Sequence, residues 1–228
     1  MNKPLIIITG ASSGIGAAVA KLFSEAGFST ALLARNKDVM NSLQLKNSIS
    51  IECDVTNIKS VNAAIDIAQG KFGTIDCLIN NAGFAKGGEF TEVSHDDNQK
   101  MIGVNLNGVI NCIESILPTM QKNKSGTIIN ISSVADRKSR PTLPVYAATK
   151  AAVKSLSESL RTANAKYGIR ICNVAPAKIK TPLLMSSNLS DDQIIQVEDM
   201  AKAILWIYQQ PKTVCIRDIV IAPTYYEA

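Results

Sequence analysis

The 228-residue sequence is poor in metal-binding side chains. Its one histidine, His95, lies in the polar stretch 94–97, and none of its five cysteines forms a Cys-x-x-Cys pair. Without ligand spacings we expect no metal site, and we expect His95 at the start of a surface helix. Most of the cysteines lie in apolar runs, so we expect reduced core thiols and a cytoplasmic protein.

Long hydrophobic runs and charge clusters are also missing. No stretch reaches the ~18 consecutive apolar residues of a membrane span. The apolar N-terminus followed by Ala18-Val19-Ala20 loosely resembles a secretory signal, but glycines and serines between residues 10 and 16 interrupt it. The net charge of +5 is mild, and Lys and Arg are scattered. We therefore expect no membrane or nucleic-acid partner, and a small anionic ligand is the better interpretation.

Short β-branched runs alternate with longer helical patterns, which predicts a parallel sheet with right-handed crossovers. Several of these runs are apolar on successive residues, as in strands buried on both faces. We expect one domain, residues 1–228, of the α/β class: a doubly wound Rossmann-type parallel sheet of about seven strands with helices on both faces. The predicted strands are 5–9, 29–34, 49–53, 75–80, 126–132, 169–175 and 216–221, and the predicted helices are 15–26, 58–71, 97–122, 146–167 and 198–210.

Residues 176–197 break this rhythm with little regular pattern. The segment follows the carboxyl end of a predicted strand, where open parallel sheets bind ligands. We expect a substrate lid near residues 177–197, the alternative being an idle surface loop.

The stretch Thr9–Gly16, TGASSGIG, joins a predicted strand to a helix. Gly10 permits a tight turn, Gly14 lets a pyrophosphate approach the backbone, and Gly16 lets the helix lie close to the sheet. A helix N-terminus offers free N–H groups to an anion. The pattern indicates a phosphate site, although a plain strand-to-helix turn is an alternative.

The spacing G-x-x-x-G-x-G, then Asn80-Asn81-Ala82-Gly83, Asn105, Ser132-Ser133 and Tyr146-x-x-x-Lys150, resembles the short-chain dehydrogenase/reductase family over nearly the whole chain. The resemblance implies hydride transfer between a nicotinamide cofactor and a small carbonyl or alcohol substrate. The expected cofactor-binding residues are Gly10, Ser12, Ser13, Gly14, Ile15, Gly16, Arg35, Asp54, Val55, Asn81, Ala82, Gly83, Tyr146, Lys150, Pro176, Ile179 and Thr181.

The end of the second predicted strand indicates which nicotinamide cofactor binds. NAD-binding proteins of this type usually carry an acid there for the ribose hydroxyls. Ala34 occupies that place here and Arg35 follows, and a guanidinium can pair with the 2′-phosphate of NADP. We therefore expect NADP, with Arg35 as a plain surface charge the alternative.

Four residues make up the expected catalytic set. Tyr146 and Lys150 are one helical turn apart, and a nearby ammonium should lower the phenol pKa so that Tyr146 can exchange a proton. By family resemblance, Ser133 holds the substrate oxygen, Lys150 also binds the nicotinamide ribose, and Asn105 fixes a water behind the lysine. Asn107 rivals Asn105 by sequence alone, but the family's N-x-x-G pattern selects Asn105.

Two positions depart from the family. Pro176-Ala177 stands where Pro-Gly is common in the family. Alanine has fewer allowed backbone conformations than glycine, and we expect this to affect the nicotinamide side of the pocket. Asp136 replaces a usual glycine after the catalytic serine, near the expected mouth of the site, where we expect an effect on substrate choice.

The substrate pocket is expected between Phe84-Ala85, residues 134–143 and the lid residues 183–189. Arg137, Lys138 and Arg140 either hold a substrate carboxylate or are solvated charges. The C-terminal region resembles the NADP-dependent 3-hydroxy acid (serine-type) dehydrogenase subgroup. A 3-oxoacyl-carrier-protein reductase, a broad carbonyl reductase and a non-catalytic NADP-binding sensor are the alternatives.

We expect a homo-oligomer, a dimer or a tetramer. In the family the helices matching 97–122 and 146–167 form the dimer surface, and tetramers also pair the last helix and last strand. Trp206 and Tyr208 would then be partly buried between subunits; the alternative is that these elements face only their own sheet.

Overall fold

The computed structural model describes residues 3–181 and 193–226. Its centre is a seven-stranded sheet in the order β3-β2-β1-β4-β5-β6-β7, and every neighbouring pair of strands is parallel. The strand order reverses between β1 and β4, which creates a crevice at their carboxyl ends. The strands are β1 (Leu5–Thr9), β2 (Ser29–Ala34), β3 (Ser48–Glu52), β4 (Ile75–Asn80), β5 (Gly126–Ile131), β6 (Ile169–Pro176) and β7 (Asp218–Ile221).

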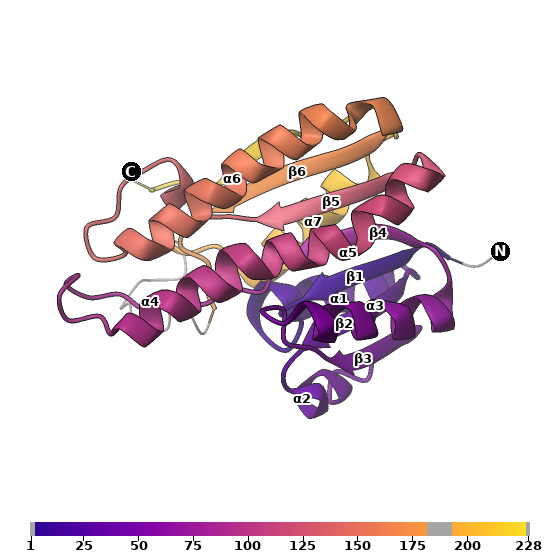
Figure 1. Ribbon diagram of the computed structural model, residues 1–228, viewed down its shortest axis with the longest axis horizontal. Coiled ribbons are helices and arrows are strands. Elements are labelled where there is room, and N and C mark those ends of the chain that lie inside the picture. Colours follow the sequence, from indigo (N-terminus) through magenta and orange to yellow (C-terminus); the bar gives the residue numbers. More distant parts are fainter. Residues whose placement is uncertain (1–2, 182–192, 227–228) are drawn as a thin grey trace.

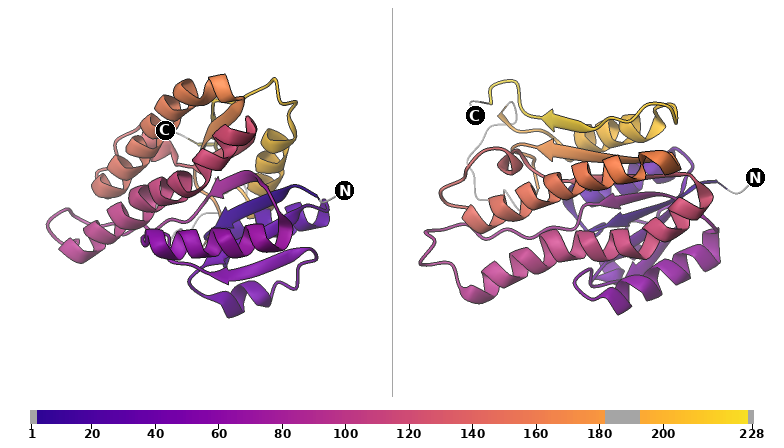
Figure 2. Two further views of the ribbon diagram at one scale, coloured as in Figure 1. Left: turned by 45° about the vertical axis from the view of Figure 1, so that its right-hand side comes forward. Right: turned by 45° about the horizontal axis from the view of Figure 1, so that its top comes forward.

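Helices cover both faces of the sheet (Figures 1 and 2). One hydrophobic cluster joins the sheet to α3 (Ile58–Phe72), α5 (Gly108–Asn123) and α6 (Pro144–Asn164). A second cluster joins the opposite face to α1 (Gly14–Glu25) and α7 (Val197–Gln209). The inner strands are apolar on successive residues because both of their faces are buried. The predicted doubly wound fold is confirmed.

Element boundaries differ from the prediction at a few places. The short helix α2 (Lys37–Asn41) was not predicted, because five residues carry no usable periodicity; the Asn36 side chain caps it by accepting from Val39 N. The predicted last strand shortens to β7, which begins at Asp218. His95 is exposed and begins helix α4 (His95–Ile102), as predicted.

The predicted long helix 97–122 is not continuous. It consists of α4, a π-helical turn over Gly103–Asn107, and α5. Such wide turns often occur at functional sites. Here the turn carries Asn105, which is fully buried.

A row of polar side chains crosses four neighbouring strands. Strand register aligns Asn80 with Asn130, Asn130 with Asn173, and Asn173 with Asp218. The Asn80 amide donates to Asn130 Oδ1 at 2.8 Å, and the Asn130 amide donates to Ser157 Oγ of α6 at 2.8 Å. The row fastens the sheet to α6, the helix that carries Tyr146 and Lys150.

The predicted lid lies only partly within the described residues, since 183–189 fall outside them. The flanking parts are joined: Lys180 N donates to Ile195 O at 2.9 Å, and Ile195 N donates to Lys178 O at 3.0 Å. Among helices in the described part of the chain, none is both long and apolar enough to cross a membrane.

Candidate active site

The turn after β1 contains glycines at positions where a side chain would not fit. Gly10 and Gly14 have φ of +65° and +55°, a conformation that side-chain-bearing residues rarely adopt. A Cβ on Gly10 would lie 2.8 Å from Ala82 Cα. A Cβ on Gly16 would overlap the Gly10 carbonyl and lie 2.5 Å from Asn81 Nδ2. The free N–H groups of α1 therefore open onto an accessible turn, as an anion site requires.

The loop after β4 is fastened to this turn. Thr9 Oγ1 accepts from the backbone N–H groups of Asn81 and Ala82, both at 3.0 Å. Asn81 Nδ2 donates to the carbonyls of Thr9 and Gly10, at 3.0 and 3.2 Å. Asn81 thus holds the phosphate-type turn in shape while also lining the cavity beside it. The part played by Thr9 was not predicted, because a strand-ending threonine has no distinctive signal.

Asn105 holds the same loop from its other side. Its Oδ1 accepts from Phe84 N and its Nδ2 donates to Phe84 O, both at 2.8 Å. Nδ2 also donates to Thr149 Oγ1 of α6 at 3.2 Å. The π turn therefore connects the loop after β4 to the helix of the expected proton-transfer residues.

Ser133, Tyr146 and Lys150 converge at the carboxyl end of β5. The Ser133 hydroxyl is near enough to the Tyr146 phenol to lower the pKa of that phenol. Lys150 Nζ lies 5.7 Å from the centroid of the Tyr146 ring and donates to the Ile131 carbonyl at 2.9 Å. Lys150 is buried, so a cationic side chain is held without direct contact with bulk water.

Burial moves the two titrating groups in opposite directions. Burial raises the pKa of the Tyr146 phenol. The Ser133 hydroxyl partly offsets this rise, and the negative charge of Asp136 adds to it. Burial lowers the pKa of Lys150 to about 8, against the opposing effect of Asp136. The expected lowering of the Tyr146 pKa by Lys150 is not found, because Lys150 has no resolved effect on the phenol and burial raises its pKa.

One cavity of about 1120 Å³ runs along this edge of the sheet. Its wall includes the predicted residues Gly10, Ser12, Ser13, Gly14, Ile15, Arg35, Asp54, Val55, Asn81, Ala82, Gly83, Ser133, Tyr146, Lys150, Pro176, Ile179 and Thr181. Of the predicted catalytic and cofactor-binding residues, Gly16 and Asn105 do not line it and support the wall from behind. Arg35 is exposed at one end and makes no ion pair with any described residue.

The other end of the cavity is formed by Phe84, Ala85, Thr142 and Leu143 together with three lysines that sequence reasoning missed. These are Lys86, Lys100 and Lys178. Lys100 Nζ lies 4.2 Å above the Phe84 ring, in a cation–π geometry. Surface lysines carry no distinguishing signal in a sequence, so only their place in the fold brings them to the wall.

The predicted substrate contacts at residues 136–140 are corrected. Asp136 is buried and does not line the cavity. The Arg137 guanidinium is engaged by Asp136 and Asp218, and Arg140 donates to the Tyr226 hydroxyl. Lys138 is exposed and lies outside the cavity wall. These cations therefore do not form a carboxylate site in this structure.

The backbone restriction expected at Ala177 is not found at that residue. Ala177 N donates to Ile221 O of β7 at 2.9 Å, and Ala177 is not among the residues of positive φ. That conformation falls on the next residue, Lys178, with φ of +46°. The alanine is accommodated because the left-handed conformation falls on Lys178 and not on Ala177.

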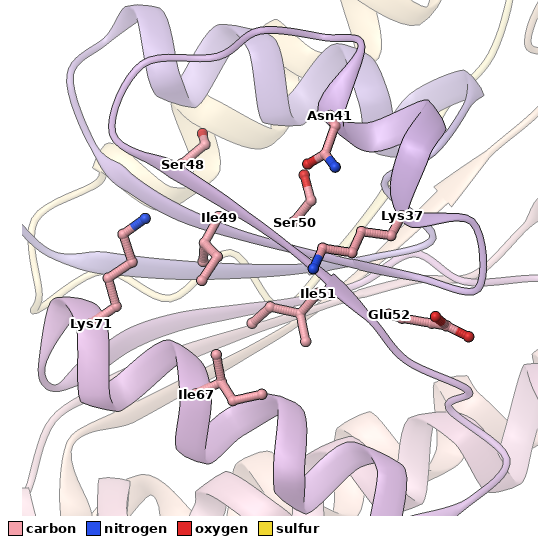
Figure 3. A pocket seen from close by; sticks show the side chains of 9 residues that line it. All are labelled: Lys37, Asn41, Ser48, Ile49, Ser50, Ile51, Glu52, Ile67 and Lys71. Atoms are coloured by element: carbon pink, nitrogen blue, oxygen red, sulfur yellow. The ribbon is translucent and has the colours of Figure 1, made fainter.

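A second, shallower hollow of about 520 Å³ lies on the edge strand β3, between α2 and α3 (Figure 3). Lys37 and Lys71 flank it, and Ile49, Ile51 and Ile67 provide its apolar floor. The hollow lies at the β3 edge of the sheet, and β2, β1 and β4 separate it from β5, the strand that Ser133 follows. None of the predicted site residues lines it.

Comparison with known proteins agrees with this arrangement. The sequence profile of the short chain dehydrogenase family matches residues 4–192. An uncharacterized oxidoreductase of Staphylococcus aureus strain N315 is 35% identical over 227 residues, which cover 98% of each chain.

Two solved structures have the same fold over nearly their whole length. The closed form of serine dehydrogenase complexed with NADP+ has a TM-score of 0.93 and 26% identity, covering 98% of this chain and 96% of that one. A 3-ketoacyl-(acyl-carrier-protein) reductase from Brucella melitensis complexed with NADH has a TM-score of 0.91 and 26% identity, covering 97% of each chain.

Proposed function

Because this chain belongs to the short chain dehydrogenase family and is an oxidoreductase of that family, we propose that it transfers a hydride between NADP(H) and a small carbonyl or alcohol substrate. One observation carries the proposal. Ser133, Tyr146 and Lys150 line the same cavity as the glycine turn, and Lys150 Nζ lies 5.7 Å from the centroid of the Tyr146 ring.

The residues of the cavity fit a dinucleotide phosphate. Gly10 and Gly14 have left-handed backbone conformations, and no side chain caps the N-terminus of α1 by a hydrogen bond, so its N–H groups are available to an anion. Arg35 stands at the end of β2 without an ion-pair partner among the described residues, ready for a phosphate. These features favour NADP over NAD, although the named neighbours include one complex with NADP+ and one with NADH.

The protein's own part of the reaction is positioning and proton transfer. The bound cofactor supplies or accepts the hydride. Ser133 Oγ holds the substrate oxygen, and the Tyr146 hydroxyl gives that oxygen a proton in reduction or takes one in oxidation. The Lys150 ammonium stabilises the phenolate that remains, and Asn105 fixes a water behind it for proton exchange.

The finer substrate proposal is a 3-hydroxy acid, supported by the likeness to serine dehydrogenase. A 3-oxoacyl-carrier-protein reductase is the second candidate, supported by the likeness to the 3-ketoacyl reductase. A broad carbonyl reductase and a non-catalytic NADP-binding sensor complete the alternatives.

We place the protein in the cytoplasm because all five cysteines are free thiols.

A substrate screen tests these proposals. NADPH and NADH oxidation should be followed with a panel of ketones, aldehydes and 3-oxoacyl thioesters, and NADP+ and NAD+ reduction with 3-hydroxy acids. We expect turnover with the NADP pair, and fastest with 3-hydroxy acids. Turnover only with thioesters supports the second candidate, whereas tight NADPH binding without turnover on the whole panel supports the sensor.

A further inference from the structure

Asp136 is a buried carboxylate surrounded by hydrogen-bond donors. Its side chain has no exposed surface. Arg137 Nε and Nη2 donate to it at 2.6 and 3.1 Å, and Ser132 Oγ and Asn173 Nδ2 donate at 2.9 Å each. These four donor contacts are the surroundings that an ionised carboxylate needs. Since burying a charge is costly, a site this complete indicates a charge held in a fixed place.

The positive charge of Arg137 does not belong to Asp136 alone. Its Nη1 and Nη2 also donate to Asp218 of β7, at 3.0 and 2.8 Å. Asn173 Nδ2 bridges the same two carboxylates, donating to Asp218 Oδ1 at 2.9 Å. The two carboxylates together raise the pKa of the guanidinium. One cation shared by two anions leaves the cluster with a net negative charge.

This negative charge lies beside the residues of the proposed proton transfer. Ser132 Oγ lies 2.9 Å from Asp136 Oδ2 and 3.3 Å from the Lys150 carbonyl, so one hydroxyl separates the carboxylate from the first turns of α6. The field of Asp136 raises the pKa values of both Tyr146 and Lys150. No other acidic residue has a resolved effect on either group.

The polar and titratable groups around Asp136 come from the segment after β5 and from β6, α6 and β7. The neutral ones are Ser132, which follows β5, and Asn173 of β6. The ionisable ones are Tyr146 and Lys150 of α6, Arg137 next in the chain, and Asp218 of β7, on which Lys154 of α6 acts in turn.

We propose that Asp136 is a positioning residue for the proposed hydride transfer: its fixed negative charge keeps the buried Lys150 in its ammonium form, and its hydrogen bond to Ser132 braces the start of α6. Without such a charge, burial would move Lys150 further toward its neutral form. The inference rests on the proposed function, but its electrostatic part concerns groups that can be titrated in the protein without substrate.

Two substitutions test this proposal, because they should shift the Lys150 pKa in opposite directions. Asp136→Asn keeps the shape of the side chain and removes the anion, so the Lys150 pKa should fall by about one pH unit. Arg137→Gln leaves Asp136 uncompensated, so the Lys150 pKa should rise. Asp218→Asn is the matched control, because it removes the same charge from the more exposed end of the cluster and should lower the pKa by less than Asp136→Asn.

The direct readout is the pH titration of the lysine Cε signals by ¹³C NMR, with the Lys150 signal assigned by its loss in Lys150→Arg. Opposite shifts in the two variants support the proposal, and so does either single shift if the other variant does not fold. No shift in a folded Asp136→Asn protein, or the same shift in Asp136→Asn and Asp218→Asn, overturns it.

The pH profile of kcat/KM for alcohol oxidation is the second readout. Removing the anion should move the acidic limb to lower pH, because it makes proton release from the Tyr146–Lys150 pair easier. A purely structural Asp136 would lower the rate without moving the limb, and that result overturns the proposal. If the wild-type protein turns over no substrate, the proposed function fails while the NMR titration still decides the inference.

Discussion

At the scale of single residues, burial determines the state of the proposed proton-transfer groups. Tyr146 and Lys150 have no counter-charge in direct contact, so loss of hydration favours the neutral form of each. The Lys150 ammonium is kept by a carbonyl at 2.9 Å and by the nearby carboxylate. Changes of one atom or one charge at these positions should therefore have large effects on function.

Tyr146→Phe removes only the phenolic oxygen. We expect kcat to fall by about 10²–10⁴-fold, the usual contribution of a general acid or base, with cofactor affinity nearly unchanged. Tyr225→Phe, at a tyrosine that is 73% exposed, is the matched control and should retain full activity. Steady-state kinetics and fluorescence titration with NADPH measure both quantities, and an active Tyr146→Phe protein would show that another group transfers the proton.

Lys150 should make stability depend on pH. Its pKa in the folded protein is lowered to about 8, whereas an unfolded lysine titrates near ~10.4. Between these values the unfolded chain binds more protons, so the unfolding free energy rises with pH by up to ~3 kcal/mol, and below the folded pKa this gain is absent. The wild-type protein should therefore gain stability relative to Lys150→Met as the pH rises through this window. Urea unfolding across the range measures it, and a constant difference contradicts the expected pKa.

Arg35→Asp should exchange cofactor preference. Loss of a charge-assisted bond to the 2′-phosphate should weaken NADPH binding by ~10–100-fold and leave NADH binding nearly unchanged. Lys71→Asp makes the same charge change outside the cavity, and so controls for net charge. If the ratio of the two dissociation constants is the same in Arg35→Asp as in the wild-type protein, a different residue reads the phosphate.

At the scale of elements, the junction of β1 and α1 depends on the absence of one side chain. Gly16 allows α1 to approach the Gly10 carbonyl and the Asn81 amide, which themselves shape the turn. The same contact that holds the helix on the sheet therefore also shapes the proposed cofactor site.

Gly16→Ala should lower the unfolding free energy by ~1–3 kcal/mol and weaken cofactor binding, because the backbone must shift to admit the methyl group. Gly70→Ala is the control, since a Cβ on Gly70 of α3 has no neighbour within 4 Å. That variant should be more stable by ~0.5–1 kcal/mol, because alanine loses less backbone freedom on folding. Equal stability changes in the two variants, measured by thermal denaturation, would mean that the junction is not tightly packed.

At the scale of the whole molecule, the exposed apolar side chains indicate a different contact between subunits from the one expected from the sequence. The large hydrophobic side chains of α5 and α6 are not among the exposed ones in the described residues. Trp206 of α7 and Val220 of β7 are 50% and 45% exposed. Tyr208 is buried in its own chain and donates to Asp76 at 2.6 Å, so the expectation that it lies between subunits is wrong.

We therefore expect light scattering to report a dimer or tetramer that depends on α7 and β7. Trp206→Glu should reduce the assembly state, because it places a charge on an apolar contact. Phe90→Glu, at a residue that is 61% exposed on another loop, should leave it unchanged. A monomeric wild-type protein contradicts the predicted assembly, and an unchanged oligomer in Trp206→Glu moves the contact elsewhere.

The sequence by itself determined the strand–helix order, the doubly wound sheet and the identity of the glycine turn, because these depend on local periodicity and on backbone freedom at fixed positions. Tertiary structure decided what each polar side chain meets. Asp136 looked like a residue of the pocket mouth, yet its partners are Ser132 just after the end of β5, Asn173 on β6 and, through Arg137, Asp218 on β7. The π turn at Asn105 likewise depends on a loop 21 residues earlier in the chain. Such contacts join elements that are neighbours only in the folded sheet, and no local pattern encodes the burial that sets their charges and pKa values.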